Sequence, residues 1–178
     1  MNALIIYGTR SGATKKIADE IGKVLGEQGF AVTVEDASKS RGIDVNAYDL
    51  VVVGSSVWAL AWKRQAMDFL KRNQKTLAGK KVALFWSGWA GDDPVDQGTI
   101  DKSMAKVTDI VAGIKPLGTA YFGSYTRFDS WNPMARIACN FMKKEFEKKG
   151  IDTSKPVDRR DWNAIRQWAA DVATKAKA

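Results

Sequence analysis

Three hydroxyl side chains and one glycine stand together just after the first apolar run of the sequence. Residues 9–14 are Thr-Arg-Ser-Gly-Ala-Thr, and they follow the run at 3–7 and open a helical pattern. A helix N-terminus presents unpaired backbone N–H groups and the positive end of the helix dipole, while Thr9, Ser11 and Thr14 add hydroxyl donors. Gly12 lets the backbone approach a ligand with no side chain in between. The combination predicts a site for a terminal phosphate monoester.

The spacing of the glycines excludes two other phosphate-binding motifs. A P-loop needs Gly, four residues, Gly-Lys and then Ser or Thr, and a dinucleotide fingerprint needs G-x-G-x-x-G; the sequence contains neither. A hydroxyl-rich loop around a single glycine indicates a mononucleotide instead. The alternative is an ordinary capped turn between a strand and a helix, because hydroxyl residues are also common helix caps.

The elements that position this loop follow from the apolar patterns. Short continuous apolar runs, typical of strands buried on both faces, occur at 3–7, 31–35, 50–54, 81–86 and 117–122. Helical patterns lie between them at 13–28, 64–73 and 100–111. This order predicts an α/β domain of three layers, with a doubly wound, five-stranded parallel sheet. The loops that follow the strands would then meet at one edge of the sheet, where such folds bind ligands.

The C-terminal third contains a final helix and, before it, a long connection. Asp161 can cap the helix, and an apolar stripe at helical spacing predicts that one face joins the core. The stripe consists of Trp162, Ile165, Trp168, Ala169 and Val172. The connection, an insert at about 124–156 after the fifth strand, holds aromatic residues and an amphipathic helix at about 134–149. Connections of this size often carry function.

A single cysteine and the absence of histidine restrict the chemistry. Cys139 alone can form neither an internal disulfide nor a cysteine metal cluster, and without histidine the usual zinc and iron sites are improbable. Catalysis by a Ser-His-Asp or Cys-His arrangement is excluded as well. We therefore predict no metal ligand and no catalytic nucleophile. One reduced cysteine, and no apolar run near the roughly 20 residues that span a bilayer, favour a cytoplasmic protein.

The length and net charge of the chain limit its number of domains and the kinds of partner that it can have. A chain of 178 residues suits one domain, 1–178. Its 28 Lys and Arg against 20 Asp and Glu give a net charge of +8, which favours anionic partners such as phosphorylated cofactors, acidic proteins or anionic lipid. Ordinary solvated helix faces are the alternative explanation of this charge. No recognised nucleic-acid-binding module is present, so we expect no nucleic-acid partner.

The loop at 9–14 resembles the FMN-phosphate loop of flavodoxins, in which T-x-S-G-x-T follows the first strand. The segments at 54–59 and 85–92 resemble the two loops that flank the isoalloxazine ring in that family. The resemblance implies a flavodoxin-like fold and FMN as cofactor, with Trp58 and Trp89 on the two ring faces; packing within the protein is the alternative role of each tryptophan. The implied cofactor-binding residues are Thr9, Arg10, Ser11, Gly12, Ala13, Thr14, Ser55, Ser56, Val57, Trp58, Ala59, Ser87, Gly88, Trp89 and Gly91.

Over nearly the whole chain the sequence is similar to the flavodoxin-like, quinone-dependent protoporphyrinogen dehydrogenases of bacteria. The segments that carry this similarity are 8–10, 54–57, 123–144, 152–157 and 161–162. In that family the insert is thought to help position the substrate or the membrane. The resemblance therefore implies peripheral contact with the inner face of the membrane. It also implies substrate or partner contacts by Tyr125, Arg127, Phe128, Trp131 and Arg136.

Two functions remain open at this point. In the first, an enzyme takes electrons from a reduced substrate, such as a porphyrinogen, onto FMN and passes them to a quinone. In the second, a flavodoxin-type carrier shuttles electrons between protein partners and has no small-molecule substrate. The insert and the closing segment at 152–157 favour the enzyme. The stretch at 124–134 keeps its aromatic residues but has few cations and contains the acidic Asp129, which favours the carrier.

Overall fold

A parallel sheet with the strand order β2-β1-β3-β5-β6 forms the centre of the molecule. The computed structural model describes residues 1–58, 61–88, 97–108, 110–111, 113–128 and 133–178. The parallel strands are β1 (Asn2–Gly8), β2 (Ala31–Asp36), β3 (Leu50–Trp58), β5 (Lys81–Ser87) and β6 (Gly118–Tyr121). The predicted five-stranded, doubly wound sheet is confirmed. Its topology reverses between β1 and β3, which is where open α/β sheets bind ligands.

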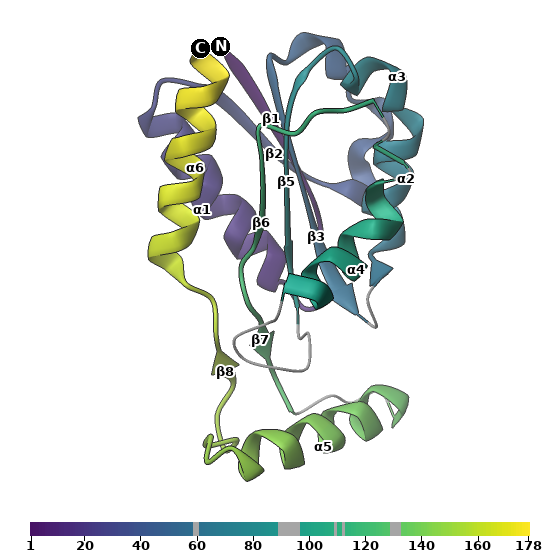
Figure 1. Cartoon of the computed structure of the whole chain (residues 1–178), viewed down its shortest axis with the longest axis vertical. Coiled ribbons are helices and arrows are strands. Elements are labelled where there is room, and N and C mark those ends of the chain that lie inside the picture. Colours follow the sequence, from purple (N-terminus) through teal and green to yellow (C-terminus); the bar gives the residue numbers. More distant parts are fainter. Residues whose placement is uncertain (59–60, 89–96, 109, 112, 129–132) are drawn as a thin grey trace.

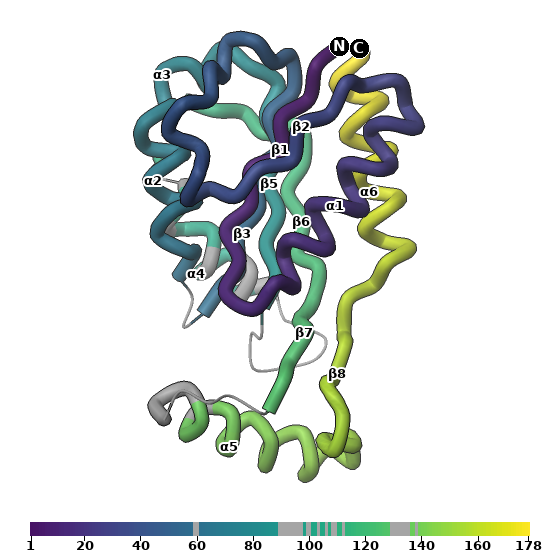
Figure 2. Tube along the Cα trace, turned by 180° about the vertical axis from the view of Figure 1, so that it is seen from behind, coloured from purple at the N-terminus to yellow at the C-terminus, as the bar shows by residue number. Residues whose placement is uncertain are grey.

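Helices cover both faces of the sheet and make it a three-layer structure (Figure 1). One face carries α1 (Ala13–Glu27) and α6 (Trp162–Lys177), which lie side by side when the molecule is seen from behind (Figure 2). The other face carries α2 (Arg64–Arg72), α3 (Gln74–Leu77) and α4 (Gln97–Thr108). The 3₁₀ segments at 37–42 and 45–47 connect β2 to β3.

Apolar periodicity explains why each helix packs as it does. On α1, Ile17, Ile21 and Leu25 recur every four residues and are fully buried against the sheet. On α6, Asp161 caps the first turn by accepting hydrogen bonds from two backbone N–H groups, and the apolar stripe behind it joins the same core. Both sequence predictions for the final helix are therefore confirmed.

The third strand is longer than its sequence pattern predicted. We expected it to end at Gly54, whereas β3 continues to Trp58 and turns into β4 (Ala61–Trp62), which pairs with it antiparallel. The strand continues past Gly54 because β5 pairs with it as far as Ser56. The position is glycine because a Cβ there would overlap the ring of Phe85. Most of the expected loop at 54–59 is thus strand, and its side chains alternate between the two faces of the sheet.

The insert lies at the carboxyl end of the sheet, away from both chain termini (Figure 1). Two short antiparallel strands, β7 (Tyr125–Thr126) and β8 (Val157–Asp158), form a ribbon that leads to and from it. Its helix, α5 (Pro133–Lys148), begins and ends one residue before the predicted bounds. Cys139, Met142 and Phe146 on α5 are buried, so the insert has its own apolar contacts.

Candidate functional site

The loop between β1 and α1 is shaped by Gly12. This residue caps α1 in the left-handed conformation, with φ 86°, and within the described part of the chain no side-chain hydrogen bond caps the helix start. The Gly12 N–H donates to Thr9 Oγ1 over 2.9 Å, so Thr9 holds the loop while its own hydroxyl hydrogen stays available. Arg10 and Ser11 are exposed. The loop therefore contains backbone N–H donors and hydroxyl groups at a helix start, which are the kinds of group that bind a phosphate.

Thr14 and Ser87 connect the start of α1 to the end of β5. Their hydroxyl oxygens lie 3.0 Å apart, and both residues are buried. One hydroxyl hydrogen makes this bond and the other remains for a further acceptor. Ala13 is buried beside them at the first position of the helix. These contacts bring residues 73 positions apart to one edge of the sheet.

Ser56 has a buried hydroxyl that no described residue satisfies. It stands in register with Ser87 on the neighbouring strand, on the sheet face that α1 covers. An unsatisfied buried polar group costs about 1–3 kcal/mol, so such groups in folded proteins call for an explanation. A ligand at the ends of β3 and β5 would supply the missing partner. The hydroxyl thus fits a bound cofactor at this place.

The residues on either side of Ser56 have different roles. Ser55 faces α2, where its hydroxyl accepts a hydrogen bond from the Lys63 N–H over 2.8 Å, and Val57 is buried in the core of that face. Trp58 at the end of β3 is 43% exposed, while Trp62 and Trp86 are nearly buried. An exposed indole at the carboxyl edge of a sheet is available to cover a flat ligand.

The corner after β5 is held in place by hydrogen bonds. The Gly88 N–H donates to Gly123 O over 3.0 Å, and the Tyr121 hydroxyl donates to Gly88 O. A Cβ at Gly88 would overlap the carbonyl of Val57, so the close approach of the two strands depends on glycine there. Burial raises the pKa of Tyr121 to about 12, so its hydroxyl remains a hydrogen-bond donor even at alkaline pH.

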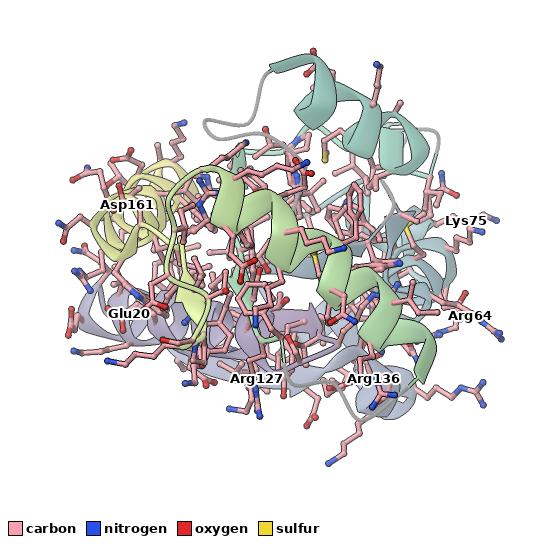
Figure 3. All side chains as sticks on the ribbon, turned by 90° about the horizontal axis from the view of Figure 1, so that it is seen from below. Glu20, Arg64, Lys75, Arg127, Arg136 and Asp161 are labelled. Carbon is pink, nitrogen blue, oxygen red and sulfur yellow. The ribbon has the colours of Figure 1, made fainter. Side chains whose placement is uncertain are left out.

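The predicted residues of the insert do not converge on one point. Tyr125 lies against the start of α1, with Lys16 Nζ 5.9 Å from its ring centroid. Phe128 packs edge-on against Phe146, with ring centroids 5.8 Å apart. Arg127 and Arg136 are exposed, and Figure 3 shows them at the lower rim of the molecule. The predicted site residues Ala59, Trp89, Gly91 and Trp131 lie outside the residues that the structure describes.

One residue next to the site was missed by the sequence reasoning. Arg160 follows β8, and its side chain is only 3% exposed. Its guanidinium donates two hydrogen bonds to the Asp158 carboxylate, and its Nη1 donates to Ala13 O over 3.3 Å. The hydrogen bond from Arg160 holds the pKa of the Asp158 carboxyl below its ordinary value. No local pattern signals this contact, because 147 residues separate Arg160 from Ala13.

The model of the flavodoxin-domain family matches residues 4–154, which is most of the chain and includes the loop, the strands and the insert helix. This chain belongs to the flavodoxin-domain family. The predicted flavodoxin-like fold is thereby confirmed, together with the general resemblance to flavodoxins.

Relatives of this flavodoxin-domain chain include an enzyme as well as flavodoxins. Protoporphyrinogen IX dehydrogenase (quinone) of Escherichia coli strain K12 is 24% identical over 176 residues, which cover 97% of this chain and 95% of that enzyme. A solved flavodoxin from the domain Archaea has 18% identity and a TM-score of 0.59, with all of both chains covered. A flavoprotein of Lactobacillus acidophilus, solved in complex with FMN, has 21% identity and a TM-score of 0.51, covering 67% of this chain and 92% of that one.

Membrane-spanning helices and metal-binding clusters are two features that the described residues lack. None of the helices in the described part of this flavodoxin-domain chain is long and apolar enough to cross a bilayer. Among the described residues, no group of three or more Cys, Asp or Glu side chains is arranged to hold a metal ion.

Proposed function

We propose that this protein binds FMN noncovalently at the carboxyl ends of β1, β3 and β5 and transfers electrons through it. Membership of the flavodoxin-domain family supports this cofactor. The observation that carries the proposal is the uncapped start of α1, where backbone N–H groups stand beside the hydroxyls of residues 9–14. A terminal phosphate is the ligand that such a helix start favours, and FMN carries one.

The residues of the chain hold and orient the cofactor, which itself supplies the redox chemistry when bound. Backbone N–H groups of the first turn of α1 and the Ser11 hydroxyl would hold the phosphate. Ser56 would donate a hydrogen bond to the cofactor, and Trp58 would cover a face of its ring. The Thr14–Ser87 hydrogen bond keeps the two loops at a constant separation. No side chain needs to act as a nucleophile.

A finer proposal is that the protein is an enzyme that oxidises a reduced small molecule and reduces a quinone. The similarity to the Escherichia coli dehydrogenase supports it, because the aligned 176 residues include the insert as well as the flavodoxin fold. The structure adds that α5 lies at the carboxyl edge, the same edge as the loop at 9–14 (Figure 1). A substrate that approaches the cofactor from that side would pass the insert.

The exposed face of α5 supports contact with a membrane, where quinones dissolve. Ile137 and Phe141 are 73% and 60% exposed and lie one helical turn apart. Arg136, Lys144 and Lys148 are exposed on the same helix, and Figure 3 shows Arg136 projecting from it. An apolar face bordered by cations is typical of helices that lie in the interface of an anionic membrane.

The second candidate is a carrier between protein partners, and the net charge of +8 favours it. Electrostatic steering brings a basic surface to acidic partners and speeds their association. The same exposed arginines at the carboxyl edge would then face a redox protein. In this alternative the chain turns over no small molecule.

The two candidates are separated by mixing experiments that follow the flavin spectrum. FMN-loaded protein is reduced anaerobically and mixed with a quinone, and oxidised protein is mixed with protoporphyrinogen. Reduction by the porphyrinogen and rapid reoxidation by the quinone are expected for the enzyme. Inertness to both, with rapid oxidation by an acidic redox protein, would establish the carrier. Failure of the apoprotein to bind FMN would refute the whole proposal.

Membrane contact is tested by flotation with vesicles that contain anionic phospholipid. The double variant Ile137→Ser/Phe141→Ser should lose vesicle binding, because it removes the apolar face while leaving the charges in place. Asn140→Ser, at an exposed position of the same helix, is the matched control and should bind as the wild type does. Equal binding of all three proteins would contradict a role of this face, and absence of binding by the wild type would reject membrane contact.

A further inference from the structure

Arg160 joins four separate elements next to the loop at 9–14. Its guanidinium forms a bidentate ion pair with Asp158 on β8, with Nε–Oδ1 and Nη2–Oδ2 distances of 2.8 and 2.7 Å. The remaining guanidinium nitrogen, Nη1, donates a hydrogen bond to the carbonyl of Ala13, the first residue of α1. Its Cζ also lies 4.9 Å from the ring centroid of Tyr125 on β7 and 4.5 Å from that of Trp162 on α6.

These contacts are of the kinds that arginine makes and other cations do not. A planar guanidinium can bond a carboxylate with two parallel N–H groups while its faces contact aromatic rings. Burial of a charge is costly unless it is paired, and the side chain of Arg160 is 3% exposed. The pairing with Asp158 meets that requirement, so the two residues form one neutral unit beside the start of α1.

The charge that Arg160 neutralises lies within electrostatic reach of the loop. Lys16, in the first turn of α1, also lowers the pKa of Asp158, although less than Arg160 does. An unpaired Asp158 would therefore place a negative charge near the N-terminus of α1, where a phosphate dianion is to bind. Like charges at such a place oppose each other.

We propose that Arg160 is a positioning residue for cofactor binding: it neutralises Asp158 and ties the β7–β8 ribbon to the first residue of α1, so that the loop at 9–14 favours a phosphate. This inference rests on the proposed function, because it takes the loop to be the FMN-phosphate site. It goes beyond that proposal by making the affinity for the phosphate depend on the segment that returns from the insert.

The test compares the binding of FMN and of riboflavin, which lacks the phosphate, to the apoprotein. Arg160→Gln should weaken FMN binding about tenfold or more, because an uncompensated Asp158 repels the phosphate, while riboflavin affinity changes by less than about threefold. The double variant Arg160→Gln/Asp158→Asn should recover most of the preference for FMN over riboflavin. The loss in the single variant should shrink as salt is added, since ions screen the repulsion.

Arg166→Gln is the matched control. Arg166 also links α6 to α1, through Glu20 at 2.9 Å, and the substitution removes the same charge about two helical turns along α1 from the loop. It should leave the ratio of FMN to riboflavin affinity unchanged. Circular dichroism and thermal unfolding of each apoprotein establish that the variants are folded.

The outcomes distinguish this inference from the proposed function. Equal loss of FMN and riboflavin affinity in Arg160→Gln, with no recovery in the double variant, would mean a general structural role and would overturn the inference. Unchanged FMN affinity in Arg160→Gln would overturn it as well. A wild-type apoprotein that binds no FMN would instead refute the proposed function. Should Arg160→Gln fail to fold, Asp158→Asn alone decides: it removes the opposing carboxylate and should retain or strengthen FMN preference, whereas a loss would count against the inference.

Discussion

At the scale of single residues, the candidate site depends on a few positions that have unusual requirements. Gly12 needs a left-handed backbone, Ser56 has a buried hydroxyl without a described partner, and Tyr121 holds the corner after β5. Each requirement is local enough to be tested by one substitution. Gly12 and Ser56 each also have a matched position in the chain where the same change should have a different result.

Gly12→Ala should weaken FMN binding and lower the free energy of unfolding by about 1–2 kcal/mol, because a Cβ is strained in the left-handed region. Nothing lies within 4 Å of the position a Cβ would take, so the effect comes from the backbone alone. Gly29→Ala is the control, since Gly29 also has a positive φ and open space, at the other end of α1. It should lose similar stability in urea unfolding but keep FMN affinity. An equal loss of affinity in both would contradict the role of the loop.

Ser56→Ala and Ser55→Ala should have opposite effects on the apoprotein. Removing the unsatisfied Ser56 hydroxyl should leave the free energy of unfolding unchanged or raise it by up to about 1 kcal/mol, yet weaken FMN binding. Removing the Ser55 hydroxyl breaks the hydrogen bond to the Lys63 N–H and should lower stability by about 1 kcal/mol. Urea unfolding and FMN titration measure both quantities. Full FMN affinity in Ser56→Ala would show that this hydroxyl does not contact the cofactor.

The raised pKa of Tyr121 predicts how the free energy of unfolding changes at high pH. Its pKa is raised from 10.0 to about 12 by burial, so the folded state holds the proton more tightly than the unfolded state does. The contribution is therefore complete below about pH 10 and is lost as the pH rises from there toward 12, on the order of 1–3 kcal/mol in all. Urea unfolding between pH 8 and 11.5 should show a shallower decline for Tyr121→Phe than for the wild type. Parallel declines would contradict this assignment.

At the scale of elements, local sequence signals set where helices begin, and pairing between strands sets where strands end. The final helix starts after Asp161, whose carboxylate oxygen accepts from the N–H groups of Asn163 and Ala164, both at 2.9 Å. By contrast, β3 ends beyond its apolar run because β4 and β5 supply hydrogen-bonding partners for its last residues. A helix satisfies its own backbone, whereas a strand needs a neighbour.

Asp161→Ala should therefore destabilise the protein through α6 alone. Loss of the two capping hydrogen bonds should lower the free energy of unfolding by about 0.5–2 kcal/mol. Asp161→Asn should retain most of the stability, because an asparagine side chain also accepts hydrogen bonds at this position. Thermal and urea unfolding give the comparison. If Asp161→Asn lost as much as Asp161→Ala, the charge would matter rather than the cap.

At the scale of the whole molecule, the chain has a net charge of +8, and its candidate site lies at one edge of the sheet. The insert lies at the same edge, so a partner that approached the proposed site from this side would meet α5 and the exposed Arg127 and Arg136 (Figure 3). Charge acts over roughly 10 Å at moderate ionic strength and governs encounter, while the apolar face of α5 acts only on contact. The salt dependence of the electron-transfer rate therefore distinguishes a charged protein partner from an uncharged small molecule.

Electron transfer to an acidic redox protein should slow by about tenfold or more between 10 mM and 500 mM salt, because steering is screened. Transfer to a short-chain, uncharged quinone in solution should change by less than about twofold under the same conditions, since a neutral reactant has no charge to steer. Stopped-flow mixing of the reduced protein with each oxidant measures both rates. A salt-independent rate with the acidic protein would argue against charge-guided docking.

The sequence alone predicted the fold class, the bounds of α1, α2 and α5 to within one residue, and the start of α6. The helix expected at 100–111 is α4, which lies three residues earlier. These features depend on interactions between near neighbours: apolar periodicity along a helix, caps at its ends and short buried runs for strands. Such patterns lie within short stretches of consecutive residues, so they can be recognised without knowing which elements pack together. The resemblance to flavodoxins added the order of the loops around the cofactor.

Tertiary structure alone decided how those loops are held together. It extended β3 to Trp58, placed Thr14 against Ser87, left the Ser56 hydroxyl buried without a described partner, and brought Arg160 to the first residue of α1. Each of these facts concerns groups from different elements, and which groups meet depends on how the sheet and helices pack. No periodicity or motif within one segment predicts such a contact, because the contact contributes free energy only once the distant segments have come together.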